Sequence, residues 1–178
     1  RPLALREVEV RGVLAMAVSN VRQAMGAGPR DPFRLEERAD DDGASIFVEA
    51  DRGAMLDVAT ILLTNAAIAV EDRDGGEVTA IVREQPDLVE IAVSDNGAGV
   101  PTEIEPRLFQ LFVTGRGRDH KHPGTGIGLA LAARWVERHG GSIRHERPDA
   151  GGARFVVAWP RSPEAPTTAP ANAVVSRR

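Results

Sequence analysis

Predicted helices alternate with pairs of predicted strands along this chain, and this order limits the folds open to it. Three segments have helical character: residues 8–25, 51–70 and 128–139. Six shorter segments are typical of strands and form three predicted hairpins: residues 33–39 with 45–50, 77–83 with 88–94, and 142–146 with 153–159. Strand pairs separated by helices indicate an α+β fold, with a mostly antiparallel sheet that carries its helices on one face.

The length of the chain fits one domain followed by a tail. Its 178 residues are close to the ~150 expected of a single domain. Residues 160–178 carry four of the twelve prolines and have no aromatic residue. Such a composition offers little apolar surface to offset the entropy of ordering. We therefore predict one folded domain over residues 1–159 and a disordered Pro/Ala-rich tail over residues 160–178.

Composition excludes several classes of function. The absence of cysteine excludes disulfides, thiol catalysis and cysteine-ligated metals. A net charge of −4 gives no electrostatic basis for binding nucleic acid. By inspection, no segment approaches the roughly 20 apolar residues of a membrane helix, and the first residues lack the apolar core of a signal peptide. We therefore expect this fragment to contact neither nucleic acid nor a membrane. We also expect a cytoplasmic location, with any anchor in another part of a longer parent protein.

Residues 95–128 form the longest segment without a regular period and contain seven of the 18 glycines. Loops of this length inside a compact domain are typically functional lids or disordered segments. Residues 95–99 (DNGAG) place an aspartate after a predicted strand, followed by two glycines that let a ligand approach the main chain. A plain turn is the alternative, because Asp-Asn-Gly is a common turn sequence.

A second glycine-rich turn, residues 124–129 (GTGIGL), leads directly into the last predicted helix. Free backbone amides and the helix dipole bind anions at such a point, and glycine leaves room for a phosphate. The turn is neither a Walker A loop nor a dinucleotide fingerprint. A helix start without a ligand is the alternative explanation.

Asn65 interrupts the apolar face that Val58, Ile61, Leu62 and Ala69 share on the second predicted helix. Leaving a buried amide unpaired costs about 1–3 kcal/mol, so this side chain needs a partner. Either the protein satisfies it as a core or edge asparagine, or it contacts a ligand. An amide oxygen suits a hard cation such as Mg²⁺.

Two further groups of side chains lie between the glycine-rich motifs. Phe109 and Phe112 belong to a short amphipathic segment, and we expect them to dock a mobile segment on the core. A basic run follows that contains Arg116 and Lys121. If this basic run faces an anion site, its positive charge would suit a polyphosphate. The alternative is that the run is a solvated loop without a ligand. The two histidines of the run lack the carboxylate spacing of a metal site.

Taken in order, the helix asparagine, DNGAG, the phenylalanine pair and GTGIGLALA resemble the N, G1, F and G2 boxes of sensor histidine kinases. The resemblance covers residues 8–159 and includes the closing segment GGSIRHERPDAGGARFVVAWP. The chain is similar to the catalytic ATP-binding domain of that family, which shares the Bergerat (GHKL) fold with gyrase, Hsp90 chaperones and MutL. The resemblance implies a two-layer α/β sandwich: a mostly antiparallel mixed sheet, about three helices on one face and a long ATP lid.

The resemblance also implies roles for individual residues. Asn65 would hold Mg²⁺, and Asp95 would accept a hydrogen bond from the adenine amino group. Residues 100–123 would form the lid and bring Arg116 or Lys121 near the γ-phosphate. The implied nucleotide-binding set is Asn65, Asp95, Gly97, Gly99, Thr114, Arg116, Lys121, Gly124, Thr125, Gly126, Ile127, Gly128 and Leu129. No catalytic residue is identified.

The implied function is that of a protein-histidine kinase. The chain would donate the γ-phosphoryl group of ATP to a histidine on a dimerisation domain absent from this fragment. The parent would be a homodimeric two-component receptor that signals to a response regulator. The one near match to a phosphoacceptor motif, residues 145–148 (HERP), lies between predicted strands and ends in proline. We therefore reject it.

Ile61, Ile68 and Ala69 depart from the family pattern, which commonly has polar, basic and aromatic residues at these positions. These departures favour a second hypothesis, a nucleotide-sensing or docking pseudokinase module without transfer activity. A third hypothesis is another ATP-driven protein of the wider group, either an anti-sigma serine kinase or a clamp-type ATPase. The apolar Ile61 argues against ATP hydrolysis.

Overall fold

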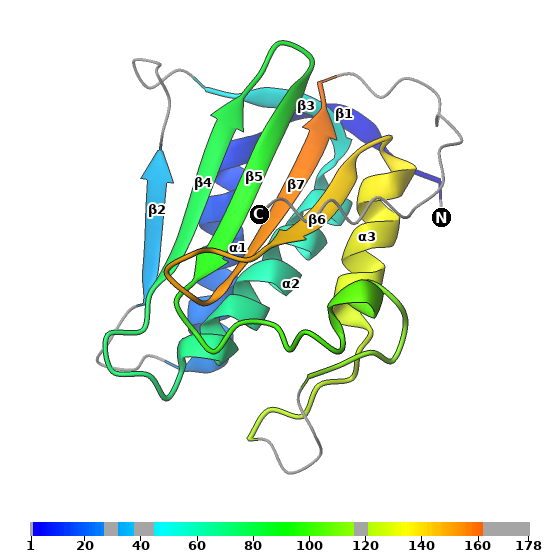
Figure 1. The fold of residues 1–178 in the computed structure, drawn as a ribbon. Helices are drawn as coiled ribbons and strands as arrows, with labels where there is room; N and C mark the ends of the chain where they lie inside the picture. The colour runs from blue at the N-terminus through cyan, green and yellow to red at the C-terminus, as the bar shows by residue number, and fades with distance from the viewer. Residues whose placement is uncertain (1, 27–31, 38–44, 116–120, 162–178) are drawn as a thin grey trace.

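The computed structural model describes residues 2–26, 32–37, 45–115 and 121–161. Figure 1 shows the order of the elements along the chain. They are β1 (Leu5–Glu9), α1 (Val10–Met25), β2 (Phe33–Glu37), β3 (Phe47–Asp51), α2 (Arg52–Val70), β4 (Val78–Glu84), β5 (Leu88–Asp95), the short 3₁₀ helix η1 (Glu105–Arg107), α3 (Gly128–Arg138), β6 (Ser142–Glu146) and β7 (Ala153–Pro160). The three predicted helices are confirmed.

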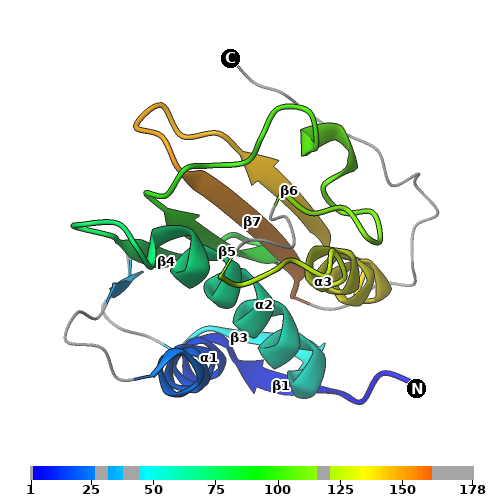
Figure 2. The same cartoon turned by 90° about the horizontal axis from the view of Figure 1, so that it is seen from below.

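The main sheet has five strands in the order β2-β4-β5-β7-β6. Only the β2–β4 pair is parallel, and the other neighbours are antiparallel. Figure 2 shows the three helices on one face of this sheet. The predicted α+β sandwich with a mostly antiparallel mixed sheet is therefore confirmed. At the end of β5, the register sets Asp95 between Val78 of β4 and Ala153 of β7.

The first predicted hairpin is wrong. β2 pairs with β4, and β3 pairs with β1 in a separate two-stranded sheet where Val8 lies opposite Val48. β1 was not predicted, because its sequence LREVE buries only Val8. The acidic turn signal that suggested the hairpin is local, whereas strand pairing depends on which distant apolar residues share a core. Residues 38–44, which contain that signal, lie outside the described part of the chain.

Helix α2 lies at the centre of the helical layer, against α1, α3 and β5. Its buried residues, which include Val58 and Leu62, belong to the same core as Val89 and Trp159 of the sheet. The expectation that no segment reaches membrane length and hydropathy is wrong for α2. This helix has 19 residues, an 18-residue stretch of it has a mean hydropathy of 1.7, and half of that stretch is buried inside the protein. Burial on several sides explains why it is apolar nearly all round.

The described chain continues two residues beyond Trp159. Pro160 is the last residue of β7, and Arg161 joins three parts of the fold. The Arg161 backbone N–H donates to Asp87 O at 3.0 Å, and its carbonyl accepts from Glu49 N at 3.0 Å. The folded region therefore includes the first two residues of the predicted tail. Residues 162–178 lie outside the described part.

Candidate functional site

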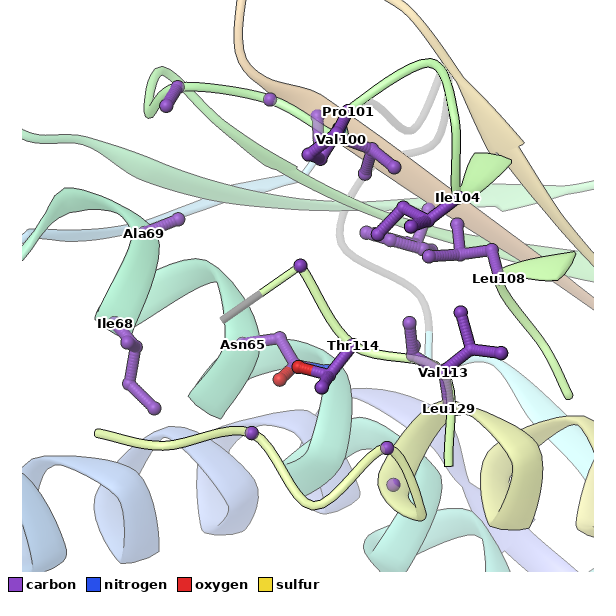
Figure 3. Close-up of a pocket in the computed structure, with 18 of the residues that line it drawn as sticks. Asn65, Ile68, Ala69, Val100, Pro101, Ile104, Leu108, Val113, Thr114 and Leu129 are labelled. Atoms are coloured by element: carbon purple, nitrogen blue, oxygen red, sulfur yellow. The ribbon is translucent and has the colours of Figure 1, made fainter. Parts of the chain in front are cut away.

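A cavity of about 470 Å³ lies between α2, the end of β5, the loop that follows it and the start of α3. This volume is within the usual range of small-molecule sites, roughly 300–1,000 Å³. Figure 3 shows α2 on one side of the cavity and the loop residues around Val100, Ile104 and Leu108 on the other. The predicted nucleotide-binding residues that line it are Asn65, Asp95, Gly99, Thr114, Gly124, Thr125, Gly126, Gly128 and Leu129.

Asp95 is a buried carboxylate at the wall of this cavity. It is 8% exposed, and its Oδ1 accepts from the backbone N–H groups of Gly97 at 2.9 Å and Ala153 at 3.3 Å. Burial raises the pKa of Asp95, while these two N–H groups favour its charged form. Both described hydrogen bonds go to Oδ1, so Oδ2 has acceptor capacity for a donor in the cavity.

The two glycines after Asp95 are needed for different structural reasons. Gly97 is not among the lining residues, and a Cβ there would lie 2.5 Å from the carbonyl oxygen of Ala69. Its lack of a side chain allows the loop to lie against the end of α2. Gly99 has a φ of +77°, which L side chains rarely adopt, and it lines the cavity. Only Gly99 is therefore placed for direct contact with a ligand.

Asn65 reaches the cavity from a position five residues before the end of α2, and Ile68 and Ala69 line the cavity one turn further along (Figure 3). No group of three or more His, Cys, Asp or Glu side chains that would hold a metal occurs within the described residues. Mg²⁺ usually keeps several waters and binds one or two protein oxygens together with substrate phosphates, and the amide oxygen of Asn65 is an oxygen of this kind.

Helix α3 begins at the cavity without a side-chain cap, unlike α1 and α2. The Glu9 carboxylate accepts from two N–H groups of the first turn of α1, and Asp51 does the same for α2. The residue that precedes α3 is Ile127, which has no such acceptor. Within the described part of the chain, no side chain caps the first turn of α3, which starts at Gly128, and the helix dipole favours negative charge there.

The backbone conformation of the glycine-rich turn depends on Gly126. Its φ is +67°, and a Cβ there would lie 2.5 Å from the backbone of Phe112. The Phe112 N–H also donates to the Gly126 carbonyl at 2.8 Å. The backbone of the phenylalanine segment therefore packs against one side of the glycine turn. The opposite side of the turn faces the cavity.

Two predicted site residues besides Gly97, Lys121 and Ile127, are described and do not line the cavity. Lys121 Nζ lies 2.7 Å from Glu71 Oε1 at the end of α2, and this hydrogen bond raises the pKa of Lys121. The same carboxylate has its Oε2 2.8 Å from Nε2 of His122. Ile127 is 44% exposed and does not line the cavity. Arg116 lies outside the described residues.

Sequence reasoning missed the apolar wall of the cavity. Ile104, Leu108 and Phe155 line it, and Leu108 is buried. The spacing of four between Ile104 and Leu108 within a loop was the signal available, since residues four apart share one side of a helical turn. Of the two loop phenylalanines, Phe109 docks on the core as expected, with its ring edge-on to Phe155 at 6.4 Å. Phe112 does not, because it is 75% exposed.

Comparison with known proteins agrees with this geometry. A family model described as histidine kinase-, DNA gyrase B-, and HSP90-like ATPase matches residues 50–163. The sensory histidine kinase/phosphatase NtrB of Rhizobium leguminosarum bv. phaseoli is 30% identical over 93% of this chain and 44% of its own length. The sensor protein FixL of Bradyrhizobium diazoefficiens is 35% identical over 90% of this chain and 32% of its own length.

A solved structure has the same fold. The mycobacterial sensor histidine kinase MprB superposes with a TM-score of 0.71 at 23% identity, covering 90% of this chain and all of that one. At this identity the likeness establishes the fold alone. The chain spans less than half the length of both curated relatives named above.

Proposed function

The chain belongs to the histidine kinase-, DNA gyrase B- and HSP90-like ATPase family, and we propose that it is the catalytic ATP-binding domain of a sensor histidine kinase. In this proposal it binds Mg-ATP and donates the γ-phosphoryl group to a histidine on a dimerisation domain outside this sequence. One observation carries the proposal: the uncapped start of α3 opens into the same cavity as the buried carboxylate of Asp95. An anion site and an amino-group acceptor in one pocket suit a nucleotide.

Base and phosphate recognition would come from opposite ends of the cavity. The carboxylate of Asp95 would accept a hydrogen bond from the adenine amino group, beside Gly99, where the base approaches the main chain. The amides of the glycine-rich turn, from Gly124 to Leu129, would receive the phosphates. Backbone donors suit this task because they are fixed before the ligand arrives. Lys121 or Arg116 would approach the γ-phosphate, and Lys121 would first have to leave Glu71.

Asn65 would hold Mg²⁺ through its side-chain oxygen, with the nucleotide phosphates as further ligands. When bound, the ion neutralises charge that develops on the phosphate oxygens. The chain's own contribution to transfer is positioning. Asp95 fixes the base, the start of α3 fixes the phosphates, and the wall of Ile104 and Leu108 excludes water from one side of the site. This account requires no covalent help from a protein side chain.

The partner would be the histidine-bearing dimerisation domain of the same polypeptide, which makes the parent a homodimer that signals to a response regulator. An exposed apolar patch beside the phosphate end supports such docking. Its members are Leu111 at 60% exposure, Phe112 at 75%, Ile127 at 44% and Leu131 at 39%. Exposed apolar side chains grouped beside a site are typical of interaction surfaces. We also propose a cytoplasmic location for this part of the protein.

The experiment that tests the proposal combines this chain with the dimerisation domain of the parent protein and ATP labelled at the γ position. We expect magnesium-dependent label on the histidine, stable to base and lost in acid. Phe112→Asp should reduce the rate of transfer without changing ATP affinity. Failure to bind ATP or ADP at millimolar concentration would contradict the proposal at its first step.

A second candidate function is a nucleotide sensor without transfer activity. Ile68 and Ala69 support it, because they line the cavity with apolar side chains that offer a nucleotide neither charge nor a hydrogen bond. Ile61 also supports the sensor function. Its Cγ2 lies 3.3 Å from the position that a Cβ on Gly128 would occupy, so an apolar group contacts the start of α3. Tight nucleotide binding without phosphohistidine, in the presence of the dimerisation domain, would select this function over the kinase.

A further inference from the structure

A single carboxylate joins the loop after β5 to the hairpin formed by β6 and β7. Glu105 begins the short helix η1, and its Oε1 lies 3.0 Å from Nδ1 of His145 on β6. Its Oε2 accepts from Nη2 of Arg147 at 2.9 Å. The same Arg147 nitrogen donates to the carbonyl of Val100 at 3.1 Å. The hairpin therefore contacts the loop at both Val100 and Glu105.

The His145 end of this contact is buried. The imidazole side chain is 4% exposed, and its ring lies 5.3 Å from the ring of Phe155, which lines the cavity. Because an ionised carboxylate can only accept hydrogen bonds, Nδ1 of His145 is protonated and donates a hydrogen bond to Glu105. The hydrogen bond from Arg147, together with the pairing with His145, lowers the pKa of Glu105, which keeps this carboxylate charged near neutral pH. A charge-assisted pair with one buried partner is stronger than an ordinary surface ion pair.

The loop that this contact holds is the apolar wall of the cavity. Val100, Ile104 and Leu108 all line the cavity and lie on either side of Glu105. The next residues, Leu111 and Phe112, are exposed and lack such an attachment to the hairpin among the interactions described for this part of the chain. The loop is therefore fixed in its first part by side chains of β6 and the residue after it.

We propose that Glu105, His145 and Arg147 form a lid anchor that holds residues 100–109 as a preformed wall of the nucleotide pocket. Glu105 is then a positioning residue for nucleotide binding, because it acts through Ile104 and Leu108. The inference rests on the proposed function and adds a role for the segment HERP, which carries no phosphoacceptor. When the wall is already formed in the free protein, nucleotide affinity is not reduced by the need to select one conformation from a mobile ensemble.

The test compares Glu105→Ala with Glu103→Ala, which removes an exposed carboxylate two residues away. In the absence of nucleotide, amide hydrogen exchange of residues 100–109 should become faster only in Glu105→Ala. The dissociation constant for ADP should rise about three- to tenfold in the same variant, because the wall is formed for only part of the time. Glu105→Gln, which keeps an acceptor for Arg147, should restore much of both properties.

Arg147→Ala provides a second route, because Arg147 is half exposed and its removal leaves the core intact. If the anchor acts as one unit, the double variant Glu105→Ala/Arg147→Ala should bind ADP about as weakly as Glu105→Ala alone. Unchanged exchange over residues 100–109 in Glu105→Ala would overturn the inference. So would ADP affinity equal to that of Glu103→Ala. Absence of ADP binding by the unsubstituted chain would instead count against the proposed function, and the exchange experiment would still decide whether the anchor exists.

Discussion

The backbone N–H of Asp51 donates a 3.0 Å hydrogen bond to Nε2 of His139. Asp51 caps the start of α2, and His139 follows the last residue of α3, so one imidazole ties together the two helices that carry Asn65 and Gly128. The other ring nitrogen of His139 lies 2.6 Å from the Trp135 carbonyl, which can only accept. The buried ring is therefore neutral, with its proton on Nδ1.

This neutral histidine predicts a loss of stability in mild acid. Burial lowers the pKa of His139 below its usual ~6.5, so the unfolded chain binds a proton that the folded chain does not. The contribution of neutral His139 to the free energy of unfolding is complete above about pH 6.5. As the pH falls toward the lower pKa of the folded state, this contribution is lost by up to ~1.4 kcal/mol per pH unit.

Urea unfolding between pH 7.5 and 5.5 measures this loss. We expect His139→Gln to be less stable at pH 7.5 and to show a smaller decrease on acidification, because glutamine does not titrate. His122→Gln, at a partly exposed histidine, should keep the decrease seen in the unsubstituted protein. An equal decrease in His139→Gln would contradict the assignment.

Asp95→Asn should weaken ADP binding about 10- to 100-fold, which corresponds to the loss of one charge-assisted hydrogen bond worth ~1.5–3 kcal/mol. Folding should be unaffected or slightly improved. Burial raises the pKa of Asp95, so above its unfolded-state pKa the carboxylate lowers stability, and the amide removes that penalty. Titration calorimetry and urea unfolding at pH 7 measure the two effects. Asp57→Asn, the same charge change at an exposed position on α2, is the control and should alter neither.

Asn65→Asp should change the magnesium dependence of nucleotide binding. A second negative oxygen attracts the cation and repels the phosphates, so the free Mg²⁺ concentration needed for half-maximal ATP affinity should shift. ATP titrations at several Mg²⁺ concentrations measure this. Asn20→Asp introduces the same charge on the exposed side of α1 and should leave the magnesium curve unchanged. Coincident curves for both variants would remove Asn65 from the metal site.

Gly126→Ala should both destabilise the fold and weaken nucleotide binding. Its positive φ alone costs an L residue ~1–2 kcal/mol, and the added Cβ would also meet the backbone of Phe112 at 2.5 Å. Gly75→Ala separates the two effects, because Gly75 has a φ of +69° but nothing within 4 Å of the added Cβ. We expect Gly75→Ala to show the conformational cost only, with ADP affinity unchanged. Denaturant unfolding and ADP titration of the pair measure the difference.

Local pattern was sufficient where the physics is local. The 3.6-residue period predicted α1 and α2 to within two residues at either end, and hairpin signals predicted β4–β5 and β6–β7. The order of the polar and glycine motifs indicated the family and the fold. The family match and the α+β sandwich confirm that reading. The sequence also set the conformation of the glycine turn, because only glycine readily takes the φ of Gly126.

Other features depended on residues brought together from distant parts of the chain. β3 pairs with β1 and not with β2, because Val48 and Val8 share a core that no turn signal encodes. Lys121 forms an ion pair with Glu71 outside the cavity, because this carboxylate, fifty residues away in the sequence, is accessible to its ammonium group. The anchor between Glu105 and His145 spans forty residues. The sequence determined which groups exist and the local shape of the chain around them. Tertiary packing decided which groups meet, because such contacts depend on burial and distance in space.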